Sequence, residues 1–473
     1  MNTHGPRSGL GPRSGPGPRP RSGWIEDWDP EDVRFWEARG KRIARRNLVL
    51  SIASEHIGFS VWSMWSVLVL FMSPRIGLPF TPGEKFLLVV TPTLVGAALR
   101  LPYSHAVTRF GGRNWTVFAT AVLLVPASAA AYFVQRPGTP LWVFLVIGAL
   151  GGVGGGNFAS SMTNITAFFP QRHQGWALGL NAGGGNLGVA VVQLLGLLVI
   201  ATAGDTHPAY VAAFYLPLIV SVALLAALRM DNLAPVRSEK GAQRDALRTA
   251  HTWWISLLYI GTFGSFIGYG FAFGLVLQTQ FGSTPLEAAS YTFLGPLLGS
   301  LARPFGGRFA DRWGGALVTA WTFVAMAAGT GGLLLASAQG SFGLFVAGFT
   351  VLFVLTGIGN GSTYKMIPAV FAERAGREVT DGGDATTAFA RARRLSGAVI
   401  GIAGAVGALG GVAVNLAFRA AYGSEGGSGT PAFLSFLGFY TLCVAVTWAV
   451  YLRPARTSRP LEAPPVRRGA TRV

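Results

Sequence analysis

Two arginines, Arg100 and Arg303, lie inside stretches of sequence that are otherwise apolar. An arginine keeps its charge in apolar surroundings, and its planar guanidinium offers a fork of donors that suits a flat anion with several acceptor oxygens. In a membrane segment, such an arginine can instead reach the interface or pair with an internal carboxylate. Glu55 is the one acidic residue that we place in the apolar stretches, so it cannot pair with both arginines. The pattern therefore favours an anion from outside the chain.

The two arginines occupy matching places in a repeated pattern. The same landmarks recur at offsets of 203 and 205 residues: Arg100, Arg109 and Gly111 match Arg303, Arg312 and Gly314, and Gly152, Gly156 and Ser160 match Gly357, Gly361 and Lys365. Two matched sets at nearly one offset predict an internal duplication, with the two halves related by a pseudo-two-fold axis.

The composition indicates which elements must position these residues. The chain has 473 residues, of which 51% are hydrophobic and only 12% charged, and its mean hydropathy is +0.44. Such a balance is not that of a soluble domain. Apolar stretches long enough to cross a hydrocarbon core of about 30 Å recur along the chain, including residues 47–72, 86–110, 141–169 and 253–281. We therefore predict an all-α membrane protein with about twelve transmembrane helices in two pseudo-symmetric six-helix bundles.

The longest basic connection divides these spans into two sets of six. We expect a disordered basic tail and an interfacial segment over 1–46, a six-helix bundle over 47–229, a cytoplasmic linker over 230–250, a second six-helix bundle over 251–453 and a cytoplasmic tail over 454–473. Gly-Pro-Arg-Ser fragments repeat in residues 1–23 and cannot bury a core.

The net charge of +18 would suggest a nucleic-acid partner in a soluble protein, but topology accounts for it here. Of 38 basic residues, 31 fall in the tails and in the loops on one side of the predicted spans, and four fall on the other side. Cytoplasmic loops retain Lys and Arg. We therefore predict a multi-pass protein of the bacterial inner membrane with both termini cytoplasmic, surrounded by lipid, monomeric and without a nucleic-acid partner.

Several other classes of function are disfavoured. Glycine runs at 154–156 and 183–185 lie within long apolar helices with no preceding strand, which argues against a nucleotide site. Glycines four residues apart instead favour close helix contact, as in the stripe Gly175, Gly179 and Gly183. No residues have metal-ligand spacing, and neither a catalytic triad nor a cofactor motif is present. We expect neither an enzyme nor a cofactor-binding protein.

Three runs of sequence resemble the signature of the NarK-type nitrate/nitrite porters, a family of the major facilitator superfamily. They are residues 156–162 (Gly-Asn-Phe-Ala-Ser-Ser-Met), 177–189 (Ala-Leu-Gly-Leu-Asn-Ala-Gly-Gly-Gly-Asn-Leu-Gly-Val) and 359–367 (Gly-Asn-Gly-Ser-Thr-Tyr-Lys-Met-Ile). The segment 307–314 also resembles the loop between helices 8 and 9 of major facilitator transporters, whose acidic and basic groups, here Asp311 and Arg312, latch the cytoplasmic side. In the first half, Thr108 stands where that aspartate would be.

The resemblance implies a binding site for nitrate or nitrite. In that family two arginines from equivalent helices grip the anion, and the matching positions here are Arg100 and Arg303. By the same match, the remaining substrate-binding residues would be Phe59, Phe158, Asn181, Tyr259 and Phe263. Without the family match, each of these aromatic residues would be assigned to ordinary helix packing.

Two further ionisable residues are candidates for coupling transport to protons. Glu55 lies one helical turn from Phe59 on the same face, so it borders the predicted site. Carboxylates in membrane helices are rare and commonly serve proton or ion pathways, although Glu55 could instead reach the cytoplasmic interface. Lys365 is either a second coupling residue or a long side chain that reaches the cytoplasmic boundary.

We therefore predict a secondary transporter of nitrate, nitrite or both that works by alternating access. A carboxylate such as Glu55 could neutralise an arginine and let the empty carrier return, so proton-coupled nitrate uptake is favoured over nitrate/nitrite exchange without protons. A membrane anion sensor that binds without transport is the alternative from another functional class.

Overall fold

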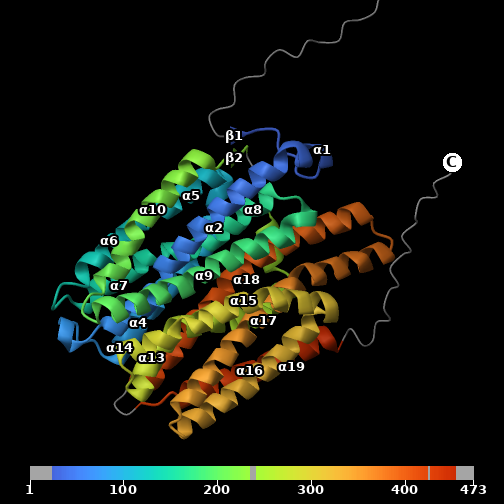
Figure 1. Cartoon of the computed structure of the whole chain (residues 1–473). Coiled ribbons are helices and arrows are strands. Elements are labelled where there is room, and N and C mark those ends of the chain that lie inside the picture. Colours follow the sequence, from blue (N-terminus) through green and yellow to red (C-terminus); the bar gives the residue numbers. More distant parts are fainter. Residues whose placement is uncertain (1–23, 235–240, 424–426, 454–473) are drawn as a thin grey trace, which may run out of the picture.

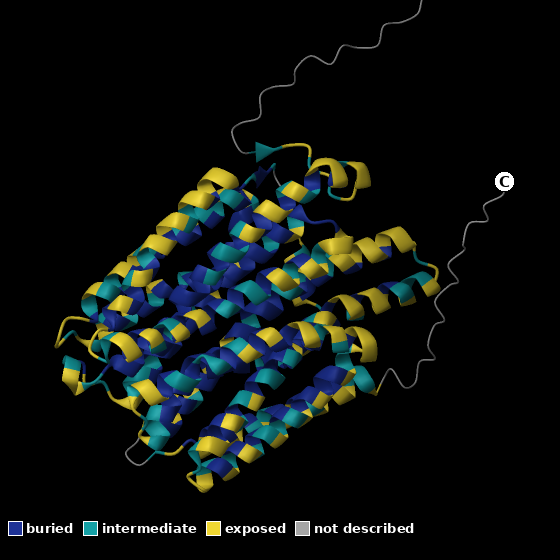
Figure 2. Cartoon of the chain, viewed as in Figure 1, coloured by how far each residue is buried: buried dark blue, intermediate teal, exposed yellow. Residues whose placement is uncertain are grey.

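The computed structural model of the protein describes residues 24–234, 241–423 and 427–453, and it is almost entirely helical (Figure 1). The predicted tails over 1–23 and 454–473 lie outside the described residues. Buried residues fill the centre of the helix array, and exposed ones line its outer surface (Figure 2).

The first half of the chain forms six membrane-crossing segments, three of which are interrupted helices. In chain order they are α2 (Lys41–Ser63) with α3 (Trp65–Phe71), α4 (Pro82–Phe110), α5 (Gly112–Ala121) with α6 (Leu124–Phe133), α7 (Leu141–Gly151) with α8 (Val153–Phe168), α9 (Gln171–Ala203) and α10 (Ala209–Arg229). We call this set the N-bundle.

The second half repeats the arrangement and is called the C-bundle. Its segments are α12 (Ala250–Tyr259), η3 (Ile260–Gly264) and α13 (Ser265–Phe281) as one, then α14 (Pro285–Thr292) with α15 (Leu294–Trp313), α16 (Gly315–Ala338), α17 (Phe342–Thr380), α18 (Ala385–Tyr422), and α19 (Thr430–Thr447) with η4 (Trp448–Leu452).

The predicted number of spans is confirmed. Ten helical segments of the described chain are long and apolar enough to cross a membrane by themselves. The two that complete the set of twelve, α2 with α3 and α14 with α15, are each broken and carry charged residues. The charge that lowers their hydropathy includes Glu55 and Arg303, which are candidate functional residues.

Short elements outside the bundles cover one end of the molecule, which we call the terminal face. Strand β1 (Trp24–Ile25) pairs in parallel with β2 (Asn232–Leu233), so the segment before the first span lies against the chain that follows α10. Between β1 and α2 the chain forms α1 (Val33–Phe35) and η1 (Trp36–Gly40). After β2, helix α11 (Ala242–Leu247) packs on α18. The far end of the molecule, which holds η2 (Pro74–Ile76), is the opposite face.

Glycines permit very close helix contact inside each bundle. A Cβ atom added at Gly154 would lie 2.1 Å from the carbonyl oxygen of Gly58, and one added at Gly357 would lie 2.1 Å from that of Gly299. No real Cβ tolerates such a distance, so α2 approaches α8, and α15 approaches α17, only because these positions lack side chains.

The two bundles meet near the opposite face. Helix α4 packs along α18, where the ring of Phe86 stacks on those of Phe418 and Tyr422 at centroid distances of 6.0 and 5.9 Å. Helix α9 packs along α15, and the side chain of Gln193 donates a 2.6 Å hydrogen bond to the carbonyl oxygen of Gly270. Stacked rings and interlocked helices therefore close the space between the bundles on this side.

Toward the terminal face the contact between the bundles is sparser, although Nη1 of Arg393 on α18 donates a 2.9 Å hydrogen bond to the side-chain oxygen of Gln171 at the start of α9. A Cβ added at Gly175 or Gly179 of α9, or at Gly397 or Gly401 of α18, would have no neighbouring atom within 4 Å. The close contact predicted for the stripe that begins at Gly175 is thus absent in this conformation. These glycine positions therefore face open space, while the hydrogen bond from Arg393 to Gln171 joins the two bundles nearer the ends of the helices.

Candidate functional site

Arg100 is held deep in the molecule by α4. Its side chain is 1% exposed, and Nη1 donates a 2.7 Å hydrogen bond to the carbonyl oxygen of Gly404 on α18. The guanidinium carbon lies 4.6 Å from the ring centroid of Phe158 and 4.9 Å from that of Phe263, close enough for cation–π attraction. Nε and Nη2 are buried and have no hydrogen-bond partner. The guanidinium is therefore fixed in place with donors to spare.

Arg303 occupies the matching place on α15, as the internal repeat predicts. It is 7% exposed, and Nη2 donates a 3.4 Å hydrogen bond to the hydroxyl of Tyr259. Its guanidinium carbon lies 5.6 Å from the ring centroid of Tyr364. Nη1 is buried without a partner. Both arginines thus combine an aromatic wall with at least one unused N–H donor.

A row of aromatic rings connects the two arginines. Phe59 stacks on Phe158 at 6.0 Å, Phe158 on Phe263 at 6.2 Å, and Phe263 on Tyr259 at 5.2 Å between centroids. Phe263 contacts Arg100, and Tyr259 contacts Arg303. The five-residue π-helix η3 carries Phe263 at the point where α12 ends after Tyr259, so both rings come from one irregular stretch of backbone. Four of the predicted aromatic residues therefore lie together with both arginines.

The arrangement has an electrostatic consequence. Three guanidinium nitrogens of Arg100 and Arg303 lie buried without a partner, and among the described residues Glu55 carries the one buried carboxylate. Burying an unpaired charge is costly. An anion placed between the arginines would accept hydrogen bonds from the free nitrogens and balance part of the charge. Planar N–H donors are well matched to a small oxyanion.

Glu55 and Asn181 form a second polar group beside the row of rings. Asn181 Nδ2 donates hydrogen bonds of 2.6 Å to Glu55 Oε2 and 2.7 Å to Ser161 Oγ. Glu55 is fully buried, and Oε1 has no partner. Helix α9 can approach the carboxylate because Gly185 has no side chain. A Cβ added there would lie 2.3 Å from Oε1. Glu55 therefore does not extend to an interface, and Asn181 contacts the carboxylate rather than an arginine.

The remaining predicted residues lie nearer the terminal face. Lys365 Nζ forms an ion pair with Asp311 at 2.9 and 3.0 Å, and both side chains are about half exposed. The guanidinium of Arg312 lies 5.5 Å from the ring centroid of Trp313. The structure thus joins the predicted latch residue Asp311 to Lys365, and places Lys365 in this exposed pair rather than beside Glu55.

Three residues of this region were not singled out from the sequence. Tyr364 faces Arg303 and has a buried hydroxyl without a partner, Trp62 lies 6.0 Å from the Arg100 guanidinium carbon, and Ser161 completes the group around Asn181. Ser161 and Tyr364 stand within the recognised runs 156–162 and 359–367, and Trp62 follows Phe59 by three residues. The signal that could have found Tyr364 and Trp62 is an aromatic residue close in sequence to a predicted site residue.

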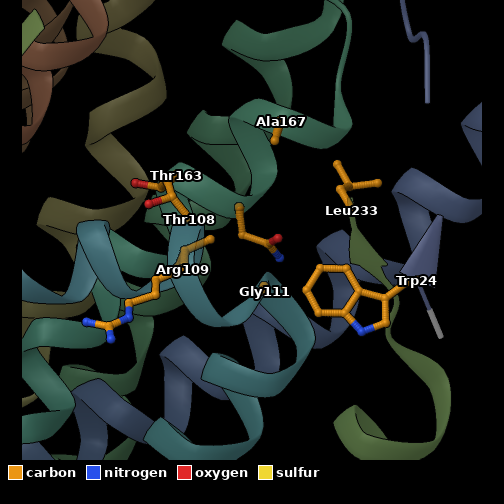
Figure 3. Close-up of a pocket in the computed structure, with 10 residues that line it drawn as sticks. Trp24, Thr108, Arg109, Gly111, Thr163, Ala167 and Leu233 are labelled. Carbon is orange, nitrogen blue, oxygen red and sulfur yellow. The ribbon is translucent and has the colours of Figure 1, made fainter. Parts of the chain in front are cut away.

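A separate cavity of about 210 Å³ opens near the terminal face, between β1, β2 and the turn from α4 to α5. Figure 3 shows Trp24 and Leu233 on one side of it, and the guanidinium of Arg109 points away from Trp24. Neither arginine of the central pair lines this cavity. Within the described ranges, no three His, Cys, Asp or Glu side chains are grouped so that they could hold a metal ion.

Comparison with known proteins first identifies the class of protein. A sequence profile of the Major Facilitator Superfamily matches residues 56–415. The fold is similar to that of the xylose transporter XylE from Escherichia coli in a partially occluded inward open conformation, with a TM-score of 0.64, 12% identity, and coverage of 87% of this chain and 98% of that one. The predicted twelve-helix major facilitator fold is confirmed, and the protein is a multi-pass membrane protein of the transporter class.

Two relatives then narrow the assignment. The chain is 40% identical to the nitrate/nitrite transporter NarU of Escherichia coli K12, over 91% of this chain and 96% of the relative. It is 33% identical to the probable nitrate/nitrite antiporter NarK2 of Thermus thermophilus, over 91% and 97%. The chain belongs to the NarK-type nitrate/nitrite porter family of the Major Facilitator Superfamily, as the sequence motifs predict.

Proposed function

We propose that the protein transports nitrate, nitrite or both by alternating access, with the anion bound between Arg100 and Arg303. The observation that carries the proposal is the set of buried guanidinium nitrogens without partners on these two residues. Their planar donors suit an oxyanion, and the surrounding rings exclude water and favour an anion that loses its hydration shell readily. The named substrates of the relatives NarU and NarK2 support nitrate and nitrite as the cargo.

The two arginines also suggest how substrate binding drives the change of conformation. Each bundle contributes one of them, so an empty site holds two like charges that oppose closure of the bundles. A bound monovalent anion reduces this repulsion and adds hydrogen bonds to both bundles. The loaded carrier therefore closes more readily than the empty one, which links movement of the bundles to movement of the anion.

The conformation corresponds to a carrier whose central site is buried and whose bundles pack most closely at the opposite face. We assign the terminal face to the cytoplasm, because most basic residues of the sequence fall in loops and tails on that side. On this assignment the rings around Phe86 and Phe418 close the site toward the outside, and the hydrogen bond from Arg393 to Gln171 lies on the cytoplasmic side. The membrane would be the plasma membrane of a bacterium, the protein a monomer, and each tail cytoplasmic.

We further propose that Glu55 couples uptake to protons. Moving a monovalent anion into a cell that is negative inside costs about 2.3 kcal/mol per 100 mV, so uptake against this potential needs another driving force. Glu55 is buried next to Asn181 and has a free carboxylate oxygen, Oε1. A protonated Glu55 would leave the anion to neutralise the arginines, whereas an ionised Glu55 would neutralise them in the empty carrier. Strict nitrate/nitrite exchange is the competing mechanism, and it matches the name of the antiporter relative.

Uptake by purified protein in proteoliposomes tests both parts of the proposal. The pH gradient and the internal nitrite concentration are varied independently while entry of labelled nitrate is measured. Accumulation in response to an inward proton gradient, without internal nitrite, is the expected result. Entry only against internal nitrite would establish exchange, and binding without entry would show a sensor rather than a carrier.

The variant Glu55→Gln isolates the role of the carboxylate, because glutamine resembles a permanently protonated glutamate. We expect nitrate exchange to continue and proton-driven accumulation to be lost. Asp381→Asn serves as the control, since Asp381 is an exposed carboxylate in the turn after α17. Normal accumulation by Glu55→Gln would remove Glu55 from the coupling mechanism.

A further inference from the structure

Among the polar side chains that are buried without hydrogen-bond partners, two lie on helices that pack together across the bundle interface. Asn186 on α9 is 1% exposed, and neither its Nδ2 nor its Oδ1 has a partner. Ser300 on α15 is 5% exposed, and its Oγ has none either. A buried amide or hydroxyl without a partner destabilises a protein, so such groups are rare unless a water or a ligand satisfies them. Two of them on facing helices need a common explanation.

Neighbouring contacts place both residues at one level of the bundle interface. Gly270 of α13 lies between the helices, because a Cβ added there would lie 3.4 Å from the Cγ of Pro296 and 3.7 Å from Cγ1 of Val189. Asn186 precedes Val189 by three residues, and Ser300 follows Pro296 by four. Since α9 and α15 pack together and run in opposite directions, both steps lead one helical turn toward the terminal face.

The same steps bring both residues next to the arginine site. Ser300 precedes Arg303 by three residues, which is about one turn. It does not lie on the side of α15 that packs on α17, because that side is formed by Gly299 and Gly306, which approach the backbone of α17 closely. Asn186 directly follows Gly185, the residue that meets Glu55. The pair thus lies between the arginines and the closure at the opposite face.

We propose that Asn186 and Ser300 form an uncharged outer subsite, in which a small oxyanion rests between the opposite face and the arginines. The inference deepens the proposed function and rests on it. An amide N–H and a hydroxyl are both donors, so they can hold two oxygens of one anion. Because the subsite has no charge, it binds the anion more weakly than the arginines do and passes it on to them. In this conformation the contact of Val189, Gly270 and Pro296 covers it.

The variants Ser300→Ala and Asn186→Leu test the subsite, with nitrate as the probe. Each removes donors while nearly preserving volume. We expect the KM for nitrate offered at the opposite face to rise roughly fivefold in each, as for the loss of one hydrogen bond. In proteoliposomes, the KM for nitrate offered at the terminal face should change little. The melting temperature of Ser300→Ala should equal or exceed that of the parent, because the alanine removes an unsatisfied hydroxyl.

Thr330→Val is the matched control, because its buried hydroxyl donates only to the Met326 carbonyl oxygen within α16. It should leave the KM unchanged. An unchanged KM in both test variants overturns the subsite, and so does a raised KM that is accompanied by a lowered melting temperature in Ser300→Ala, which would indicate a packing role. Failure of the parent to take up nitrate would instead overturn the proposed function, so the two failures are distinguishable.

Discussion

Replacing Arg100 by lysine tests the anion site most directly, because the change keeps the charge and removes the planar fork. In the parent, Nη1 is occupied by the carbonyl oxygen of Gly404, and Nε and Nη2 are left for an anion. The single ammonium of lysine can keep the bond to Gly404 or approach the anion, but it cannot present two parallel donors to one oxyanion. The variant therefore separates charge attraction from directed hydrogen bonding.

The size of the effect follows from the bonds that are lost. A hydrogen bond to a charged group contributes about 1.5–3 kcal/mol, and lysine would lose between one and two such bonds to the anion. A net loss of about 2–4 kcal/mol corresponds to binding that is about 30- to 700-fold weaker. Arg303→Lys should act in the same direction, because Nη1 of Arg303 is also buried without a partner.

Calorimetric binding of nitrate to the purified protein is the assay, together with uptake in proteoliposomes. Size-exclusion profiles and melting temperatures establish that the variants are folded. Arg109→Lys is the control, because Arg109 is exposed on the same helix and its guanidinium carbon lies 5.4 Å from the ring centroid of the neighbouring Phe110. If Arg100→Lys binds nitrate with the affinity of the parent, the assignment of the free guanidinium nitrogens to the anion is wrong.

Three further predictions concern packing, the latch and topology. Gly154→Ala should sharply lower the yield of folded protein in detergent, because the new Cβ would lie 2.1 Å from the backbone oxygen of Gly58; a normal yield would contradict the close packing. Asp311→Asn breaks the half-exposed pair with Lys365 and should change stability by less than about 1 kcal/mol, measured by thermal unfolding, while altering the transport rate. A reporter inserted within 204–207 should be external and one fused to the C-terminus cytoplasmic, and a C-terminal reporter found outside would refute the topology.

The sequence was sufficient for the fold because membrane spans depend on local composition. The apolar segments and their two-fold repeat can be found without knowing any contact. The breaks inside the segments could not be found in this way. The π-helix at Phe263 lies at a tight contact, where a Cβ at Gly264 would meet the Cα of Gly410 at 2.6 Å. Such a contact between distant residues leaves no trace in local hydropathy.

The candidate site was predictable to a different degree for each kind of residue. Arg100 and Arg303 stand out because an intramembrane charge is rare, but an aromatic residue such as Tyr364 does not, since aromatic residues are common in every span. The stripe that includes Gly175 illustrates another limit. A spacing of four predicts close contact, but a carrier makes some of its contacts in one conformation only, and the sequence contains no sign of which.

The chain between the bundles is anchored at both ends. On the N-bundle side, Asn232 Oδ1 accepts hydrogen bonds of 2.9 and 3.3 Å from the backbone N–H groups of Arg113 and Asn114 at the start of α5. On the C-bundle side, Asp245 of α11 forms a 2.5 Å ion pair with Arg394 of α18. The two anchors therefore belong to bodies that must separate and approach if the terminal face opens and closes.

This connection sets a limit on the motion by its length alone. Seven residues lead from Ala234 to Gly241, and an extended chain spans at most about 3.6 Å per residue, or about 25 Å in all. No ligand, gradient or voltage can therefore draw the two ends of this covalent connection farther apart. Covalent bonds far from any substrate thus set an upper limit on the separation of Ala234 and Gly241, and shortening the connection would lower that limit without changing the residues that bind the anion.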